Sequence, residues 1–441
     1  MKKRTVVIIS IMLIIVFSTF SFYGCKRGTT TEREQSKYVT KTMTMGESGT
    51  FKILQLTDIH FINSVIESTR KVSKSFVYRD EWAKTAIAAI IRAAAPDLII
   101  VTGDSTFTLD STMHITGNND NEAAFQKVAQ FVDSFEIPWA LIFGNHDEEG
   151  SLHAALGSVE ATKRWLGDYL KSDEIKYCIY DDGPTEITGV GNYIINVANP
   201  DGSTNMPLVL LDSGSYLRDI VNPETGESDF DQRKYEWVHD DQLDWYEAAI
   251  NDISRIEGKK VDSIIFQHIP FPEYGTVIDS YINALGDDWQ DTINENWPFG
   301  TPKTLDTAVG PITYYGGVYN DGSVASSYIG DFNGNTFDGG HEFNRLVEFG
   351  STKYVFCGHD HRNTFSFDYK GIRLTYGMSI DYSANGIVPP PLAENQRIFD
   401  ETVQRGGTLI TLGEKGSVTI EQVPFTRNLY RETLAEKGMK E

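Results

Sequence analysis

Short polar clusters follow apolar runs at five points of this 441-residue chain. Each apolar run has the length and composition of a buried strand, and each cluster contains aspartate, asparagine or histidine. The clusters are Asp58-Ile59-His60, Gly103-Asp104, Gly144-Asn145-His146-Asp147, His268 and Gly358-His359-Asp360-His361. A chain of this kind is expected to bring several strand ends together, and the oxygen and imidazole groups gathered there are suited to bind two metal ions.

Strands and helices alternate along the predicted secondary structure from residue 51 onward. Strands are expected at 51–56, 98–101 and 138–143, with helices at 82–94 and 123–135 between them. Sites in this βαβ arrangement lie beyond the carboxyl ends of the strands. Further strands are expected at 193–197, 208–211, 263–266, 354–357, 364–369, 372–376, 408–412 and 417–423, with a helix at 241–253 and a hairpin turn at 413–416.

The clusters supply seven candidate metal ligands. They are Asp58, His60, Asp104, Asn145, His268, His359 and His361. Strand side chains alternate with a period of two, so Asp58 and His60 are expected to share one face, as are His359 and His361. The carboxylate of Asp104 has two oxygens, which suits it to bridge two ions. Seven ligands for two ions leave coordination positions open, which is typical of a catalytic site and not of a structural one.

Together the five clusters resemble the calcineurin-like metallophosphoesterase family, whose pattern is D-x-H, G-D, G-N-H-[DE], H and G-H-x-H in that order. The resemblance extends from about residue 51 to about residue 382. It implies an α/β four-layer fold, with two mixed β-sheets packed as a sandwich and flanked by helices. It also implies roles for the site residues: Asp58, His60 and His361 would hold one ion, Asn145, His268 and His359 the other, and Asp104 would bridge them. His146 would be the acid–base residue, positioned by Asp147 or by another carboxylate.

Within that family, the chain resembles the purple-acid-phosphatase-like branch at residues 237–246, 268–274, 358–364 and 371–376. True purple enzymes carry a tyrosine ligand where this chain has Phe107, and a glycine where it has His60, so the purple phenolate–iron colour is not expected. The ligands suit Mn, Fe, Zn or Co alike. The resemblance therefore implies two divalent or trivalent ions without selecting the element.

The resemblance implies hydrolysis of a small phosphorylated substrate by a hydroxide that bridges the two ions. Phosphomonoesters are the leading expectation, and phosphodiesters such as nucleotides or lipid headgroups are the alternative. A third interpretation, from another class, is a surface binding protein with a non-catalytic site. A nucleic-acid partner is not expected, because the formal charge is −23 and nucleic-acid backbones require clustered lysine and arginine.

The first 24 residues have the pattern of a signal peptide. The basic residues Lys2, Lys3 and Arg4 precede an almost entirely apolar run at 5–22, and Gly24 stands just before Cys25. This pattern resembles that of a bacterial lipoprotein anchored to the membrane through a lipidated Cys25. An uncleaved membrane anchor and ordinary secretion are the alternatives. All three place the rest of the chain outside the cytoplasm.

Residues 25–49 are rich in Thr, Ser, Glu and Lys and are expected to form a flexible tether. A single metallophosphoesterase domain is expected at 50–441, with an insertion around 272–341 whose aromatic residues favour a local core over a substrate platform. Substrate selection is expected in the loops between His268 and Gly358. Cys178 and Cys357 are expected to be buried thiols, with one disulfide as the alternative. The remaining histidines, His114, His153, His239 and His341, are expected to have surface or packing roles.

Overall fold

The computed structural model describes residues 33–62, 79–107, 121–149, 159–216, 235–286, 298–319, 341–383 and 405–436. The chain divides into two units, 1–34 and 35–441, and the elements below all belong to the second. The predicted signal peptide and Cys25 lie outside the described residues. None of the described helices combines the length and the apolar composition needed to span a bilayer.

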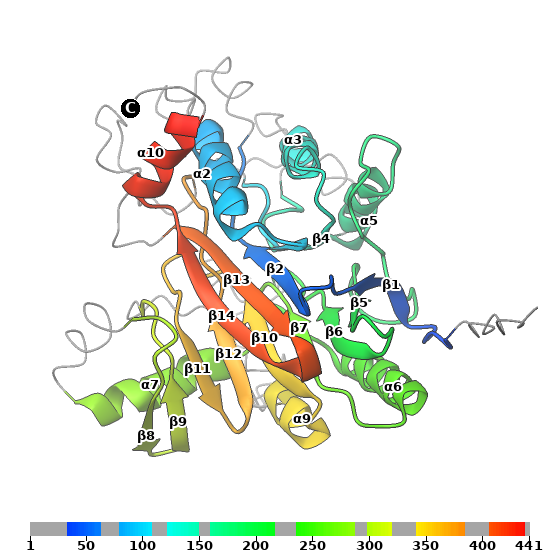
Figure 1. The fold of residues 1–441 in the computed structure, drawn as a ribbon, viewed down its shortest axis with the longest axis vertical. Coiled ribbons are helices and arrows are strands. Elements are labelled where there is room, and N and C mark those ends of the chain that lie inside the picture. Colours follow the sequence, from blue (N-terminus) through cyan, green and yellow to red (C-terminus); the bar gives the residue numbers. More distant parts are fainter. Residues whose placement is uncertain are drawn as a thin grey trace, which may run out of the picture. The chain divides into compact units, whose positions relative to one another are not determined.

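Two β-sheets lie face to face between two layers of helices (Figure 1). The five-stranded sheet has the order β14-β13-β2-β3-β4, in which β2, β3 and β4 are parallel and β13 is antiparallel to both of its neighbours. Its strands are β2 (Thr50–Leu56), β3 (Leu98–Thr102), β4 (Trp139–Ile142), β13 (Gly406–Gly413) and β14 (Val418–Pro424). Its outer layer contains α2 (Arg79–Ala94), α3 (Asn121–Asp133), α5 (Val159–Leu170) and α10 (Arg427–Glu436).

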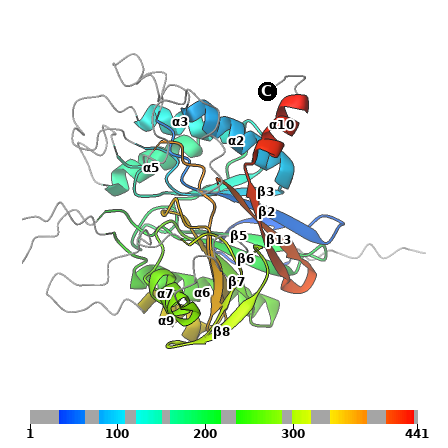
Figure 2. The same cartoon turned by 90° about the vertical axis from the view of Figure 1, so that its left-hand side faces the viewer.

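The nine-stranded sheet has the order β1-β5-β6-β7-β10-β12-β11-β9-β8. Strands β6, β7, β10 and β12 are parallel neighbours at its centre, and the pairs from β12 to β8 are antiparallel. The strands are β1 (Val39–Thr44), β5 (Tyr193–Ala198), β6 (Thr204–Leu210), β7 (Ser263–Phe266), β8 (Lys303–Thr307), β9 (Gly310–Tyr314), β10 (Thr352–Cys357), β11 (Ser366–Tyr369) and β12 (Ile372–Tyr376). Helices α6 (Asp240–Glu257), α7 (Glu273–Leu285) and α9 (His341–Phe349) cover its outer face (Figure 2).

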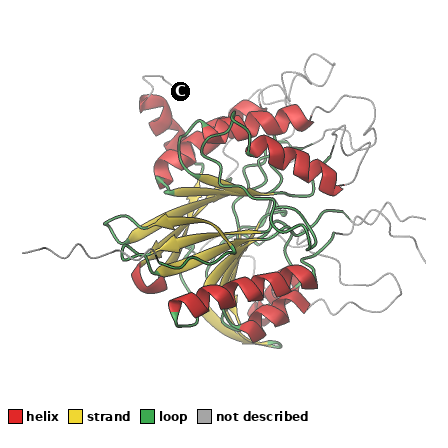
Figure 3. Cartoon of the chain, turned by 90° about the vertical axis from the view of Figure 1, so that its right-hand side faces the viewer, coloured by secondary structure: helices red, strands yellow, loops and turns green. Residues whose placement is uncertain are grey.

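Alternate residues of the central strands belong to different hydrophobic cores. Ile264 and Phe266 of β7 pack in the core that includes both sheets, whereas Ile265 packs with α6 residues such as Leu243 and Ile250. Burying one side chain of this size stabilises the fold by about 1.5–3 kcal/mol. Because both faces of β7 are covered, its sequence is continuously apolar and not alternating. Figure 3 shows the resulting order of helix, strand, strand and helix layers, which confirms the expected four-layer α/β sandwich.

Every helix and strand named from the sequence is present within a few residues of its expected position, and η2 (Glu414–Gly416) forms the turn between β13 and β14. The structure differs from expectation at 39–44. These residues were assigned to the tether, but they form β1 and pair in parallel with β5. Their valine and threonines favour strand structure, while their position at the sheet edge allows a polar composition. The pattern of an exposed edge strand is therefore easily mistaken for that of a linker.

The expected insertion at 272–341 contains regular structure in its described part, namely α7, β8 and β9. Tyr281 of α7 stacks on Tyr314 of β9, and Tyr319 packs against Phe365. These aromatic residues thus build a local core, as expected. Trp289 and Trp297 lie outside the described residues.

Cys178 and Cys357 are free thiols, so the disulfide alternative is not realised. The histidines His239 and His341 also have the local roles expected of them. His239 stacks on Trp237, and His341 forms an ion pair with Asp240 on the surface. The other two, His114 and His153, lie outside the described residues.

Candidate metal centre

The five polar clusters meet where parallel strands of both sheets end. Asp58 follows β2, Asp104 follows β3 and Asn145 follows β4, all in the five-stranded sheet. In the other sheet, His268 follows β7 and His359 follows β10. Carboxyl ends of parallel strands lie at the same edge of a sheet, and here the two sheets present those edges to each other. The site is therefore built from the junction of the sheets.

The backbone of several site residues adopts a left-handed conformation. The φ angles are 50° at Asp58, 55° at His60, 50° at Asp104 and 77° at His359. Such angles are unfavourable for residues other than glycine and cluster at functional sites. Asp58 and His60 do reach one place, but they do so through these turns and not through the alternation of a strand. The close approach also requires Gly103, since a Cβ there would lie 2.6 Å from Nδ1 of His268.

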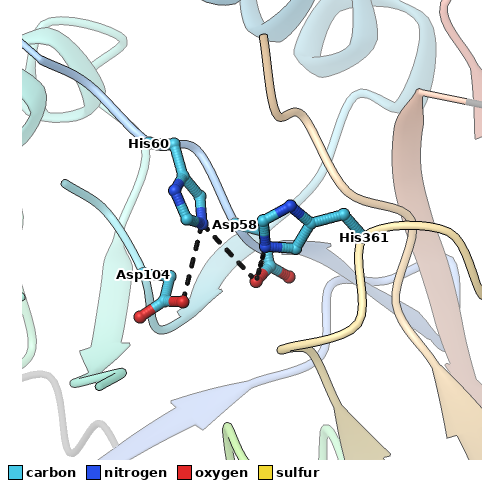
Figure 4. A group of neighbouring side chains, drawn as sticks. All are labelled: Asp58, His60, Asp104 and His361. Atoms are coloured by element: carbon cyan, nitrogen blue, oxygen red, sulfur yellow. Dashed lines mark ion pairs between the residues drawn. The ribbon is translucent and has the colours of Figure 1, made fainter. Parts of the chain in front are cut away.

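The first ligand group contains Asp58, His60, Asp104 and His361, all buried, with one ligand atom from each lying within 4.8 Å of the others (Figure 4). His361 Nε2 lies 3.3 Å from Asp58 Oδ1, and His60 Nε2 lies 3.5 Å from Asp104 Oδ2. Asp58, His60 and His361 are the three residues that the resemblance assigned to one ion, and Asp104 is the residue that it assigned as the bridge.

The second ligand group contains Asp104, His268 and His359. His268 Nε2 lies 3.2 Å from Asp104 Oδ2 and 3.2 Å from Asn145 Oδ1. Asp104 thus belongs to both groups, and in each case it does so through Oδ2. Its Oδ1 is not available, because it accepts a hydrogen bond from the backbone N–H of His146 at 2.8 Å. His359 and His361 were expected to share one face, yet they lie in different groups.

Several buried polar atoms of these groups have no hydrogen-bond partner. They are both ring nitrogens of His60, both ring nitrogens of His359, the Oδ2 of Asp104 and the Nδ2 of Asn145. Leaving one such buried atom unpaired costs about 1–3 kcal/mol. Imidazole nitrogens and carboxylate oxygens are ligands of catalytic zinc and of other transition metals. The described residues therefore fit a binuclear metal centre.

Two outer acceptors orient the imidazoles. His268 Nδ1 lies 2.8 Å from the carbonyl oxygen of Thr102, and His361 Nδ1 lies 2.9 Å from Asp381 Oδ2. Each contact directs the Nε2 of its ring toward the candidate ions, as outer partners of metal-binding histidines do. The sequence reasoning missed Asp381, although it stands five residues after β12, much as the other clusters follow their strands.

The buried carboxylates and imidazoles of the site shift one another's pKa. Burial raises the pKa of Asp104, but the charges of His268 and His146 lower it more, so the pKa lies well below its ordinary value. Burial and the charge of His361 lower the pKa of His60, while the nearby carboxylates of Asp104 and Asp58 raise it to about 9. Burial and the charge of His268 lower the pKa of His359 to about 3. Metal ions bind the deprotonated imidazole, so an ion at His60 would displace the proton that the carboxylates favour there, whereas His359 is already neutral.

His146 lies beside the two groups, with its ring centroid 5.3 Å from that of His60. Its Nδ1 is 2.8 Å from Glu149 Oε2, so the carboxylate that positions it is Glu149 and not Asp147. Asp147 instead accepts hydrogen bonds from the backbone N–H groups of Gly144 and Thr106, at 2.8 and 3.0 Å. Burial and the charge of Asp104 raise the pKa of Asp147 to about 6. Asp147 thus shapes the loop, whereas Glu149 holds the imidazole.

Residues 51–363 match the model of the family described as calcineurin-like phosphoesterase. The chain belongs to this family. It is 28% identical over 373 residues to "Probable inactive purple acid phosphatase 28" of Arabidopsis thaliana, covering 82% of this chain and 77% of that protein. It is 26% identical to "Phosphatase DCR2" of Saccharomyces cerevisiae, covering 72% of this chain and 45% of that protein. A dimetal phosphatase from Danio rerio aligns with 85% of this chain and 96% of its own, at a TM-score of 0.42 and 13% identity.

Membership of the calcineurin-like phosphoesterase family confirms the family and the sandwich architecture expected from the five clusters. The chain is a metal-dependent phosphoesterase that is homologous to purple-acid-phosphatase-like proteins. The name of the Arabidopsis relative describes that protein as inactive, whereas this chain gathers the two ligand groups in one place.

Proposed function

We propose that this calcineurin-like phosphoesterase hydrolyses phosphomonoesters with two metal ions, each Mn, Fe, Zn or Co. The observation that carries the proposal is the shared oxygen of Asp104, which faces His60 of one ligand group and His268 of the other. Two ions bound there would neutralise the phosphoryl oxygens and lower the pKa of a water molecule between them. Asp58 and His361 complete one site, and Asn145 and His359 the other.

His146 has the geometry of the proton donor to the leaving group. Its Nδ1 is in contact with Glu149, so its Nε2 points away from Glu149 and toward Tyr216. The Tyr216 hydroxyl lies 3.3 Å from this Nε2. The Glu149 carboxylate fixes the orientation of the ring, and the backbone N–H of His146 is held against Asp104. A phosphate ester bound at the ions would place its leaving oxygen near this ring. A positioned acid of this kind contributes about 10²–10⁴-fold to the rate.

The test compares hydrolysis of p-nitrophenyl phosphate with that of bis(p-nitrophenyl) phosphate, using protein loaded with Mn²⁺ or Zn²⁺. We expect faster turnover of the monoester by wild-type protein. On an alkyl phosphomonoester, whose leaving alkoxide needs a proton, His146→Ala should lose about 10²–10⁴-fold in kcat with both ions retained. His341→Ala is the matched control, because His341 lies on the surface, where it pairs with Asp240. This variant should keep its activity. A preference for the diester would assign the alternative substrate class.

Two further outcomes would contradict the proposal. Protein that binds two ions but hydrolyses neither ester would be a surface binding protein. Loss of an ion from His146→Ala would make His146 a ligand and not the acid.

We also propose that the chain is exported and anchored to the membrane through a lipid on Cys25. The support is the order of a basic segment, an apolar run at 5–22 and the pair Gly24-Cys25. Detergent phase separation of cell extracts tests this. The wild-type chain should enter the detergent phase, whereas Cys25→Ser should not be lipidated and should lack an incorporated fatty-acid label. An unlabelled wild-type chain would favour secretion or an uncleaved anchor.

A further inference from the structure

Three aromatic side chains border the candidate metal centre and are termed here the aromatic wall: Phe107, Tyr216 and Tyr235. The ligands Asp58, His60, Asp104, Asn145, His268 and His361 are only 0–4% exposed. By contrast, His146, His359 and the three residues of the wall are all partly exposed. These partly exposed groups mark the side of the centre that solvent reaches.

The aromatic wall runs from one ligand group to the other. The Phe107 ring centroid lies 5.3 Å from that of His60 and 5.0 Å from that of His146. The Tyr216 ring centroid lies 5.8 Å from that of His146 and 5.4 Å from that of Tyr235. The ring centroid of Tyr235 lies 4.2 Å from that of His359, and the two rings are edge to face. A substrate whose phosphate lies between the two groups would therefore have ring surfaces beside its leaving group.

Contacts within the fold hold the wall in place. Tyr216 and Tyr235 pair through an antiparallel backbone bridge. The backbone N–H of Ser215 donates to Glu236 Oε2 at 2.7 Å, which joins the two tyrosine segments a second time. The backbone N–H of Phe107 donates to the carbonyl of Phe61 at 3.0 Å. Rings that are positioned before a ligand arrives lose little entropy when they bind it.

We infer that the aromatic wall selects phosphomonoesters whose leaving group carries a planar aromatic ring. The inference rests on the proposed phosphomonoesterase function and adds the class of leaving group. Offset-stacked and edge-to-face ring pairs have a more favourable interaction free energy than their buried area alone supplies. An aromatic leaving group should therefore bind this wall more tightly than a saturated one of equal size. Tyr216 also contacts His146, so the leaving oxygen and its ring would meet the acid and the wall together.

The test compares benzyl phosphate with cyclohexylmethyl phosphate, because their leaving alcohols are similar in size and acidity. With wild-type protein we expect kcat/KM to be about 5–10-fold higher for the benzyl ester, the ratio that one or two ring contacts supply. Tyr235→Leu should lower the ratio, because one of the three rings is lost, whereas Tyr235→Phe should retain it. Tyr38→Leu, a partly exposed tyrosine beside Trp245, is the matched control.

A second measurement does not depend on turnover. Calorimetric titration of the metal-loaded protein with benzylphosphonate and cyclohexylmethylphosphonate should give tighter binding of the benzyl compound by a similar factor. If Tyr235→Leu does not fold, as judged by its melting curve, Tyr216→Leu takes its place.

The outcomes separate the two proposals. Equal kcat/KM for the two esters with equal binding of the two phosphonates would overturn the role of the wall and leave phosphomonoesterase activity standing. A benzyl preference that is undiminished in both leucine variants would overturn it as well. If neither ester is hydrolysed by protein that holds its ions, the proposed function fails, and the ratio of phosphonate affinities still decides whether the wall binds rings.

Discussion

Asp104 has several structural roles at the scale of a single residue. It is fully buried, its φ angle is 50°, and its Oδ1 is bound by the backbone of His146. Only Oδ2 remains to face His60 and His268. The strain of the backbone and the fixing of one oxygen together position the other oxygen between the two ligand groups. Among the described residues of the two candidate ligand groups, Asp104 is therefore the one that belongs to both.

Metal content tests whether both ion sites depend on Asp104. Asp104→Asn keeps the shape of the side chain but removes its charge, so we expect both sites to weaken and less than one ion per chain to survive dialysis. His359→Ala should lose only the ion of its own group. Elemental analysis of purified, dialysed protein measures the content, with His341→Ala as the control that keeps two ions. Retention of two ions by Asp104→Asn would show that the carboxylate is not shared.

At the scale of elements, a buried ion pair joins α5 to the segment after β6, whose described part, 211–216, includes Tyr216. Nζ of Lys163 lies 2.7 and 3.0 Å from the two carboxylate oxygens of Asp212, and the Lys163 side chain is buried. Burial lowers the pKa of Lys163, but the charges of Asp212 and Glu148 raise it further, so the ammonium stays charged. The pair thus ties a helix over one sheet to a loop of the other.

Removal of the lysine should leave Asp212 as a buried charge without its counter-ion. We expect Lys163→Met to lower the free energy of unfolding by about 3–5 kcal/mol. The neighbouring Arg164 pairs with Glu160 in a largely exposed position, so Arg164→Ala should cost less than about 1 kcal/mol. Urea denaturation compares the two variants. Similar losses in both would mean that burial of the Lys163 pair has no special effect.

At the scale of the whole molecule, the metal centre connects the two sheets. Asp58, Asp104 and Asn145 come from the ends of one sheet, and His268 and His359 come from the ends of the other. Ions bound to both sets would act as cross-links between the sheets. They would also compensate the buried carboxylates, which otherwise repel each other. Metal binding is therefore expected to be coupled to the stability of the sandwich.

Chelation tests this coupling. An ion present at 100 times its dissociation constant stabilises the folded chain by about 2.7 kcal/mol. Dialysis against EDTA should therefore lower Tm by about 5 °C, and returning Mn²⁺ or Zn²⁺ should restore it. Calorimetry measures the shift. Asp104→Asn is the comparison, and its Tm should respond little to chelator. An unchanged Tm in wild-type protein would show that bound ions do not stabilise the junction between the two sheets.

The helices and strands that were named from the sequence were predictable because their signals are local. Apolar runs such as 98–101 and helical spacing such as that of 82–94 depend on neighbouring residues alone. The ligand clusters were predictable for the same reason, since each directly follows its strand. Strand β1 was missed because an edge strand needs no apolar run. Its partner β5 lies about 150 residues further along the chain, and local pattern contains no information about such a pairing.

By itself, the sequence determined the family, most of the strands that lead to the site and the types of candidate ligand at their ends. Only the tertiary structure decided which groups meet: Glu149 and not Asp147 at His146, Asp381 at His361, and the aromatic wall at the open side of the centre. His146 and Tyr216 are 70 residues apart, and His361 and Asp381 are 20 apart. Such contacts arise from how loops of different strands turn and approach one another. Their geometry is therefore a property of the packed sheets and not of any one segment.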